Sequence, residues 1–524
     1  TTEIYTLSLH DALPISSIVS CAETDKKKSN DTSYLEEITI AQLQQGYKEG
    51  KFTITKVVTD YLSRIEEIDK NGPKLNAIIA VNPDALKIAE ELDKELAEGK
   101  SRGPLHGIPV ILKDNIDTKD NMPTTAGAVV LKNSFVGKDS WVAAKLREAG
   151  AIIIAKSNLS EWANFRANLS SSGWSGVGGQ TRNPYELDRN PCGSSSGSGV
   201  AVSANLCTFA IGTETNGSIV CPSNNNGIVG IKPTVGLISR TGIIPISFTQ
   251  DTPGPMARSV EDAVISLGAM VEADPSDSKT LDANAKIYTD YSEFLKPNGL
   301  KGKRIGLLTN ISGFHHKVDT LMKKAVADMK NAGAEVIEIS FPIQREINNA
   351  SFEVMLFEFK DGLNKYFATL GDNAPIKSIE ELIAFNLKDS VELRYFDQQL
   401  LELAQSKGDI ESAEYKKALD LMMKGIRTNG IDKVMDTNKL DALIAPTGAP
   451  AWKTDPINGD NFLGSSSSYA AIAGYPNISV PMGNIDGLPV GISIFGKAWS
   501  EPVLIEIAYS YEQATKHRIK PEYR

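Results

Sequence analysis

Two loops rich in glycine and serine are the part of this sequence best suited to chemistry. The first covers residues 192–198 and the second residues 212–218, with a short apolar run at residues 207–211 between them. The apolar run predicts a buried strand, and Pro222 fits only the first turn of a helix beginning near Ile219. Helix starts present free backbone N–H groups and the positive end of the helix dipole. Both loops can therefore stabilise an anion beside a serine hydroxyl, as an acyl-transfer enzyme requires.

Two other interpretations of these loops are weaker. A flexible linker would be flanked by polar sequence, whereas these loops alternate with apolar runs of the buried type. A phosphate-binding loop would show the pattern Gly-x-x-x-x-Gly-Lys-Ser/Thr, which the stretch lacks.

A serine nucleophile needs a base, and the histidines offer little support for one or for a metal site. They are His10, His106, His315, His316 and His517. A buried lysine can serve instead, because desolvation disfavours the ammonium and lowers the lysine pKa. Most lysines are solvated surface residues, but Lys113 ends the apolar run at residues 108–112 and precedes a polar loop. That position favours Lys113 as the base.

These residues fall into three ordered motifs that resemble the signature of the amidase signature family, whose hydrolases use a Ser–cis-Ser–Lys triad. The family's G-I-P-x-x-x-K-D-N element corresponds to residues 107–115, its G-G-S-S-G-G loop to residues 192–197, and its G-T-D-x-G-G-S-I element to residues 212–219. The resemblance extends from about Ile38 to His517 and is closest to bacterial peptide-amidase-like members.

The resemblance implies a role for three residues. Ser218 would attack the amide carbonyl, Ser194 would relay its proton, and neutral Lys113 would accept that proton. Spacing alone cannot choose among the adjacent Ser194, Ser195 and Ser196. The family motif selects Ser194 and implies a cis peptide bond before it.

The same resemblance implies an oxyanion hole built from backbone N–H groups. These belong to Thr215, Asn216, Gly217 and Ser218. The sequence departs from the family pattern at Cys192 and Asn216, which replace glycines, and at Glu214, which replaces the commoner Asp. Asn tolerates unusual backbone angles better than most residues. The run Asn224-Asn225-Asn226 replaces small residues, and the sequence gives no physical reason for it.

Composition restricts the classes of protein. Of 524 residues, 41% are hydrophobic and 23% charged, which is ordinary for a globular protein with a large core. The formal net charge of −10 argues against a nucleic-acid partner, and no stretch approaches the ~18 apolar residues of a membrane span. Nothing in the sequence calls for a cofactor or a metal, and the oligomeric state is not indicated.

The N-terminal stretch differs from the rest of the chain. Residues 1–16 resemble translated adapter sequence, so we exclude them from fold reasoning. Residues 18–21 match a bacterial lipobox, which predicts a lipid anchor at Cys21 and a location in the cell envelope or periplasm, although so short a pattern also arises by chance. We assign residues 17–37 to the lipobox remnant and a polar tether, and residues 38–524 to a single amidase domain.

The remaining cysteines are Cys192, Cys207 and Cys221. An odd number without regular spacing does not indicate a disulfide framework. We expect buried free thiols that the chemistry does not need.

Alternating helices and apolar strands predict an α/β fold with a large mixed β-sheet covered by helices on both faces. The predicted strands outside the two serine loops cover residues 108–112, 151–155, 304–308, 334–339, 441–445, 474–481 and 489–495. A mainly helical region at about residues 346–428 contains an apolar and aromatic run that suits either the core or a substrate cleft. The run comprises Phe352, Met355, Leu356, Phe357, Phe359 and Tyr366.

We expect a hydrolase of carboxamides that acts on peptide-like or aryl/acyl amides in preference to free glutamine. Two alternatives stay open: the A subunit of the glutamyl-tRNA amidotransferase, whose cytoplasmic location the lipobox contradicts, and a catalytically silent binding protein of the same fold.

Overall fold

The structure, a computed structural model, describes residues 31–524 apart from residues 289 and 373. The adapter-like segment and the predicted lipidation site Cys21 lie outside the described residues. Residues 32–524 pack as one unit. Within the described residues, no helix is both long enough and apolar enough to cross a membrane.

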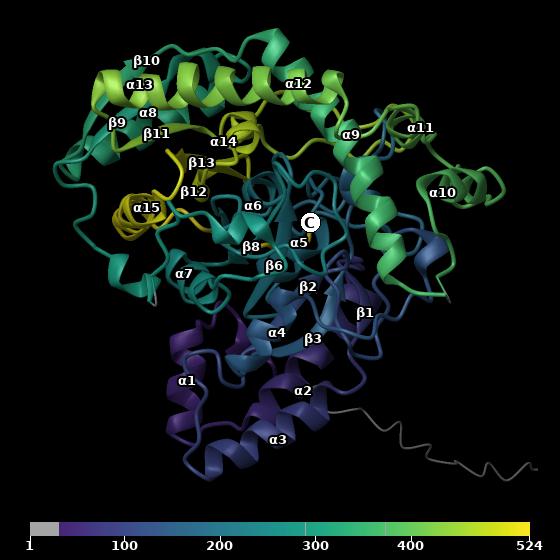
Figure 1. Ribbon diagram of the computed structural model, residues 1–524. Coiled ribbons are helices and arrows are strands. Elements are labelled where there is room, and N and C mark those ends of the chain that lie inside the picture. Colours follow the sequence, from purple (N-terminus) through teal and green to yellow (C-terminus); the bar gives the residue numbers. More distant parts are fainter. Residues whose placement is uncertain (1–30, 289, 373) are drawn as a thin grey trace, which may run out of the picture. The chain divides into compact units, whose positions relative to one another are not determined.

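A mixed sheet of eleven strands forms the centre of the described chain (Figure 1). In spatial order the strands are β1 (Ile78–Val81), β3 (Ile152–Ser157), β2 (Pro109–Lys113), β6 (Phe209–Glu214), β8 (Thr252–Ala257), β7 (Val229–Lys232), β12 (Asn477–Ile485), β13 (Leu488–Phe495), β11 (Ala442–Pro446), β9 (Arg304–Leu308) and β10 (Glu335–Ile339). A separate two-stranded sheet joins β4 (Trp174–Ser175) to β5 (Gly179–Gln180). The α/β fold with a mixed sheet that the sequence predicts is confirmed.

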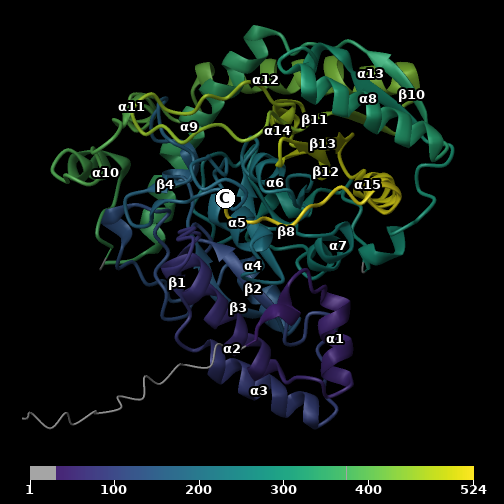
Figure 2. The same cartoon turned by 180° about the vertical axis from the view of Figure 1, so that it is seen from behind.

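Strands β2, β3, β6, β8, β11 and β13 are buried at every residue, because both faces of the sheet are covered. The helices of the first half are α1 (Ile40–Lys48), α2 (Ile54–Arg64), α3 (Ala85–Ala97), α4 (Trp141–Glu148), α5 (Ser196–Ser203), α6 (Val220–Asn225) and α7 (Val260–Gly268). Those of the second half are α8 (His316–Asn331), α9 (Arg345–Thr369), α10 (Ile379–Asn386), α11 (Gln399–Gln405), α12 (Ala413–Met423), α13 (Asp432–Asn438), α14 (Ser467–Ala473) and α15 (Glu501–Thr515). Helices α1–α3 gather at the end of the sheet that carries β1 and β3, as both views show (Figures 1 and 2).

Strands β2 and β6 position the serine and lysine motifs relative to each other. They are neighbours and run parallel, with Leu112 opposite Ile211. The carboxyl ends of parallel strands meet at the same edge of a sheet, so Lys113 and Thr213 are placed side by side there. The predicted strand at residues 207–211 ends too early, because Gly212–Glu214 continue it by pairing with β8.

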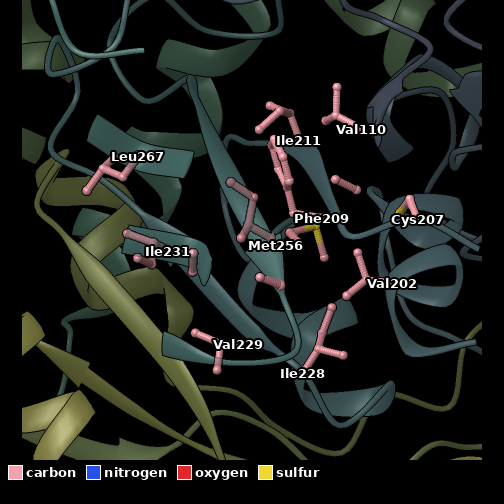
Figure 3. Close-up of a cluster of buried hydrophobic side chains, with 14 of the residues drawn as sticks. Val110, Val202, Cys207, Phe209, Ile211, Ile228, Val229, Ile231, Met256 and Leu267 are labelled. Atoms are coloured by element: carbon pink, nitrogen blue, oxygen red, sulfur yellow. The ribbon is translucent and has the colours of Figure 1, made fainter. Parts of the chain in front are cut away.

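The apolar core around β6 holds this edge in place (Figure 3). Phe209, Ile211 and Met256 are fully buried in one large cluster with Val110. In the predicted helical region, Leu356, Phe357 and Phe359 are core residues, whereas Tyr366 also borders a cavity.

Ile211→Ala is expected to lower the free energy of unfolding by about 2–5 kcal/mol, because it leaves a cavity in a close-packed core. The control Leu387→Ala changes a side chain that is 64% exposed and should shift stability by about 0.5 kcal/mol or less. Thermal and denaturant unfolding of the two variants would measure the difference. Equal effects would show that β6 is not part of the stabilising core.

Candidate active site

Lys113 is the last residue of β2 and is fully buried. Its Nζ lies 2.8 Å from Ser194 Oγ and 2.8 Å from Thr213 Oγ1, and it donates to the Thr213 carbonyl at 3.2 Å. Asn115 Nδ2 donates to the same threonine hydroxyl at 3.0 Å. Since a hydroxyl both donates and accepts, the two hydroxyls can accommodate the lysine amine in either protonation state.

Burial lowers the pKa of Lys113 from its usual 10.5 to about 7. The carboxylates of Asp251 and Glu214 oppose this effect by favouring the ammonium, but desolvation is the larger cause. Near neutral pH a large fraction of Lys113 is therefore the free amine, the form that can accept a proton.

The structure distinguishes the three adjacent serines that spacing could not. Only Ser194 contacts Lys113, and the peptide bond between Gly193 and Ser194 is cis, as the resemblance implies. Ser195 Oγ donates to the Thr213 carbonyl at 3.1 Å. Ser196 Oγ donates to the carbonyl of Cys192 at 2.6 Å.

Ser218 lies in the loop between β6 and α6 and is 8% exposed. The backbone N–H of Ser195 donates to its carbonyl at 3.1 Å, which joins the two serine loops. Among the described residues, none forms a hydrogen bond with Ser218 Oγ. The structure therefore pairs the Ser194 hydroxyl with Lys113 but forms no hydrogen bond between the hydroxyls of Ser194 and Ser218.

The backbone N–H groups of residues 215–218 have no acceptor among the described residues. The start of α6 is satisfied separately, because Glu214 Oε2 accepts from the N–H groups of Ile219 at 2.8 Å and Val220 at 3.0 Å. Gly217 has a φ of +87°, and a Cβ there would lie 3.1 Å from Ser467 Oγ. The loop thus presents unpaired backbone donors, the type of group that an oxyanion hole requires.

The two departures from the family pattern in this loop have structural explanations. Asn216 does not take a positive φ, and its side chain accepts from Ser467 Oγ at 2.8 Å and donates to Ser468 Oγ at 3.1 Å, at the start of α14. The longer Glu214 side chain reaches the first N–H groups of α6.

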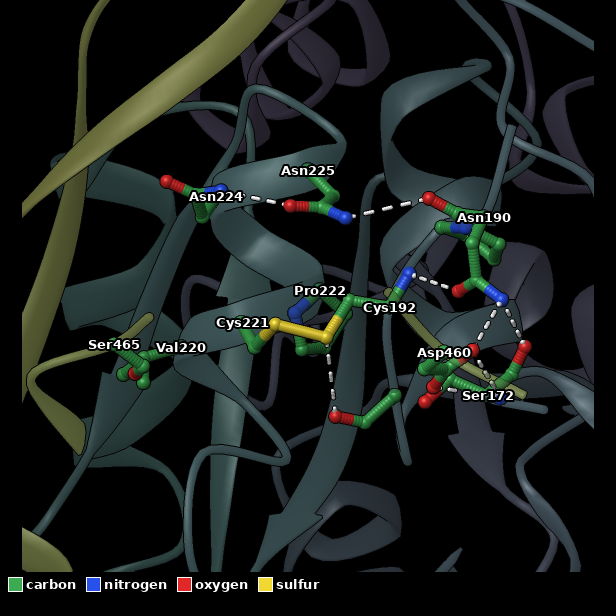
Figure 4. The surroundings of a disulfide bond; sticks show 12 residues. Ser172, Asn190, Cys192, Val220, Cys221, Pro222, Asn224, Asn225, Asp460 and Ser465 are labelled. Carbon is green, nitrogen blue, oxygen red and sulfur yellow. Dashed lines mark hydrogen bonds between the residues drawn. A yellow bond between two sulfur atoms is a disulfide. The ribbon is translucent and has the colours of Figure 1, made fainter. Parts of the chain in front are cut away.

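The expectation of free thiols at Cys192 and Cys221 is wrong, because these cysteines form a disulfide (Figure 4). Their Cα atoms are 5.9 Å apart, within the range a disulfide spans. Residue spacing could not reveal this disulfide. The two cysteines are 29 residues apart in the sequence, and they meet only because the fold places the two serine loops side by side. Cys207 is a buried free thiol, as predicted, and burial raises its pKa to about 12.

The three asparagines that the sequence left unexplained fasten α6 to its surroundings. Asn226 Nδ2 donates to the Pro191 carbonyl at 2.9 Å, and Asn225 Nδ2 to the Asn190 carbonyl at 3.3 Å. Asn224 Oδ1 accepts from the backbone N–H of β13 residue Gly491 at 2.7 Å. Sequence reasoning missed these bonds because their partners are backbone atoms, which leave no residue signature.

A cavity of about 530 Å³ adjoins the site. Asn115, Thr213 and Thr215 form the wall next to the reactive loops. One part of the remaining lining is aliphatic and aromatic, with Ile243, Ile244, Pro245, Ile246, Phe248 and Tyr366. The other part is charged, with Arg240, Asp251, Asp277, Lys279, Asp361 and Lys365. No group of acidic, histidine or cysteine side chains within the described ranges could hold a metal ion.

Comparison with known proteins identifies the family. The Amidase family model matches residues 56–505. The native peptide amidase from Stenotrophomonas maltophilia superimposes with a TM-score of 0.89 at 49% identity, covering 93% of this chain and 99% of that one. A probable amidase of Arabidopsis thaliana is 40% identical over 514 residues, 97% of this chain and 95% of its own length. The A subunit of the glutamyl-tRNA(Gln) amidotransferase of Thermoanaerobacter pseudethanolicus is 34% identical, covering 93% of this chain and 98% of its own length.

The chain therefore belongs to the amidase family and is a hydrolase of that family. Among these three proteins, the peptide amidase has the highest sequence identity.

The pH dependence of activity should report the protonation of Lys113. A base must be neutral, so kcat/KM is expected to rise as pH increases through about 7. Glu214→Gln removes a charge that favours the ammonium, so the rising limb should move to lower pH. Glu338→Gln, an exposed change in β10, is the control that should leave the limb in place. If the rising limb of the pH profile also stays in place in Glu214→Gln, the charge of Glu214 does not influence the pKa of Lys113.

Proposed function

We propose that this protein hydrolyses peptide-like or aryl/acyl carboxamides, with C-terminally amidated peptides as the preferred class. The observation that carries the proposal is the buried contact of Lys113 Nζ with Ser194 Oγ, beside a nucleophile loop whose N–H groups are unpaired. The 49% identity to a peptide amidase supports the choice of substrate class.

In the proposed reaction, neutral Lys113 draws a proton from Ser194, which takes one from Ser218 as its Oγ bonds to the amide carbon. The N–H groups of residues 215–218 hold the carbonyl oxygen as it becomes negative. The proton returns through the same relay to the amide nitrogen, the C–N bond breaks, and ammonia or an amine leaves. Water then gives a proton to the relay as its oxygen bonds to the acyl carbon. The bond between that carbon and Ser218 Oγ breaks, the relay returns the proton to Ser218 Oγ, and the acid product leaves as the carboxylate after losing its proton to solvent.

The cavity supports an amide with an apolar portion. Its wall next to Thr215 carries polar groups that suit the scissile amide, and the aliphatic and aromatic stretch at residues 243–248 suits an apolar side chain. The charged part of the lining, at Arg240, Lys279 and Asp361 among others, suits the polar backbone or the terminal charge of a peptide.

The proposed relay predicts that Lys113, Ser194 and Ser218 act as one unit. Ser218→Ala is expected to lower kcat by several orders of magnitude, and adding Lys113→Ala should cost little more. Ser312→Ala, at an exposed serine outside the relay, is the control and should keep kcat within about two-fold, since surface substitutions away from special features have small effects. Wild-type turnover by Ser218→Ala, measured as ammonia release, would refute the mechanism.

Substrate preference separates the candidate functions. The value of kcat/KM should be highest for an amidated dipeptide with an apolar side chain, lower for a simple aliphatic amide and lowest for glutamine, because only the dipeptide offers both a peptide backbone and an apolar side chain to the cavity. The measurement uses the purified chain alone in one buffer. Glutamine as the best of the three would favour the amidotransferase function instead.

A further inference from the structure

We propose that the Cys192–Cys221 disulfide positions Ser194 and Ser218 relative to each other, which makes the two cysteines positioning residues of the reaction. The inference rests on the proposed function, because it assigns the disulfide to the geometry of that serine pair. It goes beyond fold stabilisation, since it predicts an effect on turnover in the folded protein.

The position of the disulfide in the chain is the first argument. Cys192 lies two residues before Ser194, and Cys221 lies three residues after Ser218. The covalent bond, drawn in Figure 4, therefore joins the loop of the proposed relay serine to the start of α6, directly after the loop of the proposed nucleophile. A proton relay depends on short contacts between hydroxyls, and an error of about 1 Å in such a geometry can cost ~100-fold in rate.

The two cysteines are themselves firmly held. The N–H of Cys192 donates to Asn190 Oδ1 at 2.8 Å, and its carbonyl accepts from Ser196 Oγ at 2.6 Å. The N–H of Cys221 donates to the Gly217 carbonyl at 2.8 Å. The disulfide therefore connects two rigid segments, so it transmits the position of one loop to the other.

The bond is also shielded from solvent. Cys192 and Cys221 are 4% and 5% exposed and pack with Trp452, whose Nε1 donates to Asp460 Oδ1 at 3.1 Å. A buried cross-link of this kind resists reduction in the folded state, because attack on a disulfide requires access to a sulfur atom.

The backbone conformation of Cys192 is one that cysteine rarely adopts. Its φ is +59°, in the left-handed region, which is unfavourable for residues other than glycine. A cysteine in this backbone conformation is explained by the bond that it makes to Cys221. The same observation supplies a substitution that the backbone tolerates, namely Cys192→Gly.

Other contacts compete for the same role. Asn225 and Asn226 fasten the far end of α6 to residues 190–191, and the Ser195 N–H bonds to the Ser218 carbonyl. If these were sufficient, removing the disulfide would lower stability but leave turnover unchanged. The two possibilities are therefore experimentally distinct.

The test uses the double variant Cys192→Gly/Cys221→Ala with Cys207→Ala as the matched control, all in the full chain carrying Cys21→Ser, which serves as the wild type. The unfolding temperature of each protein is measured first, and kinetics are then recorded well below it. We expect kcat of the double variant to fall about ten-fold or more with KM within two-fold, and Cys207→Ala to keep kcat within two-fold. A double variant that is folded and has wild-type kcat would overturn the proposal.

Two further measurements keep the outcome independent of substrate choice. Alkylation after unfolding without reductant should modify Cys207 alone in the wild type, and modification of all three cysteines would overturn the proposal. Labelling of Ser218 by a fluorophosphonate, followed by intact mass, should slow about ten-fold in the double variant but not in Cys207→Ala. If the wild type labels at Ser218 yet hydrolyses no amide, the proposed substrate class fails while the labelling rates still decide the role of the disulfide.

Discussion

Desolvation of a single ammonium group is the constraint on which the rest of this site depends. Lys113 becomes a free amine near neutral pH because β2 places it in the interior, with two hydroxyls and a carbonyl as neighbours. A solvated lysine at the same point would remain protonated and inert. The sheet around it, fully buried on both faces, provides the low-dielectric surroundings that lower its pKa.

The opposing charges determine how far that pKa falls. Asp251 is bound to Thr215 Oγ1 at 2.5 Å and to two backbone N–H groups, and Glu214 is fixed at the start of α6. Both carboxylates therefore have a structural role as well as an electrostatic one. The same side chains that shape the nucleophile loop also moderate the basicity of the proposed base, so geometry and proton affinity cannot be varied separately.

Local motifs predict those parts of the site that depend on short-range patterns. A strand leading to Lys113, a strand between the two serine loops, a helix starting near Ile219 and the burial of Lys113 follow from apolar runs and helix-start signals. What the sequence could not predict depends on tertiary pairing: the extension of β6 through residue 214 and the disulfide. In each case the deciding partner is a backbone atom or a residue in a distant segment, and no local pattern encodes it.

The left-handed backbone at Cys192 has a consequence for how this sequence can change over evolution. Losing Cys221 first would leave a buried thiol in an unfavourable backbone conformation with no compensating bond. Replacing Cys192 by glycine first would relax the backbone and leave only an unpaired Cys221. The effects of replacing the two cysteines on stability are therefore expected to be coupled, and glycine at position 192 is the first replacement that the backbone accommodates best.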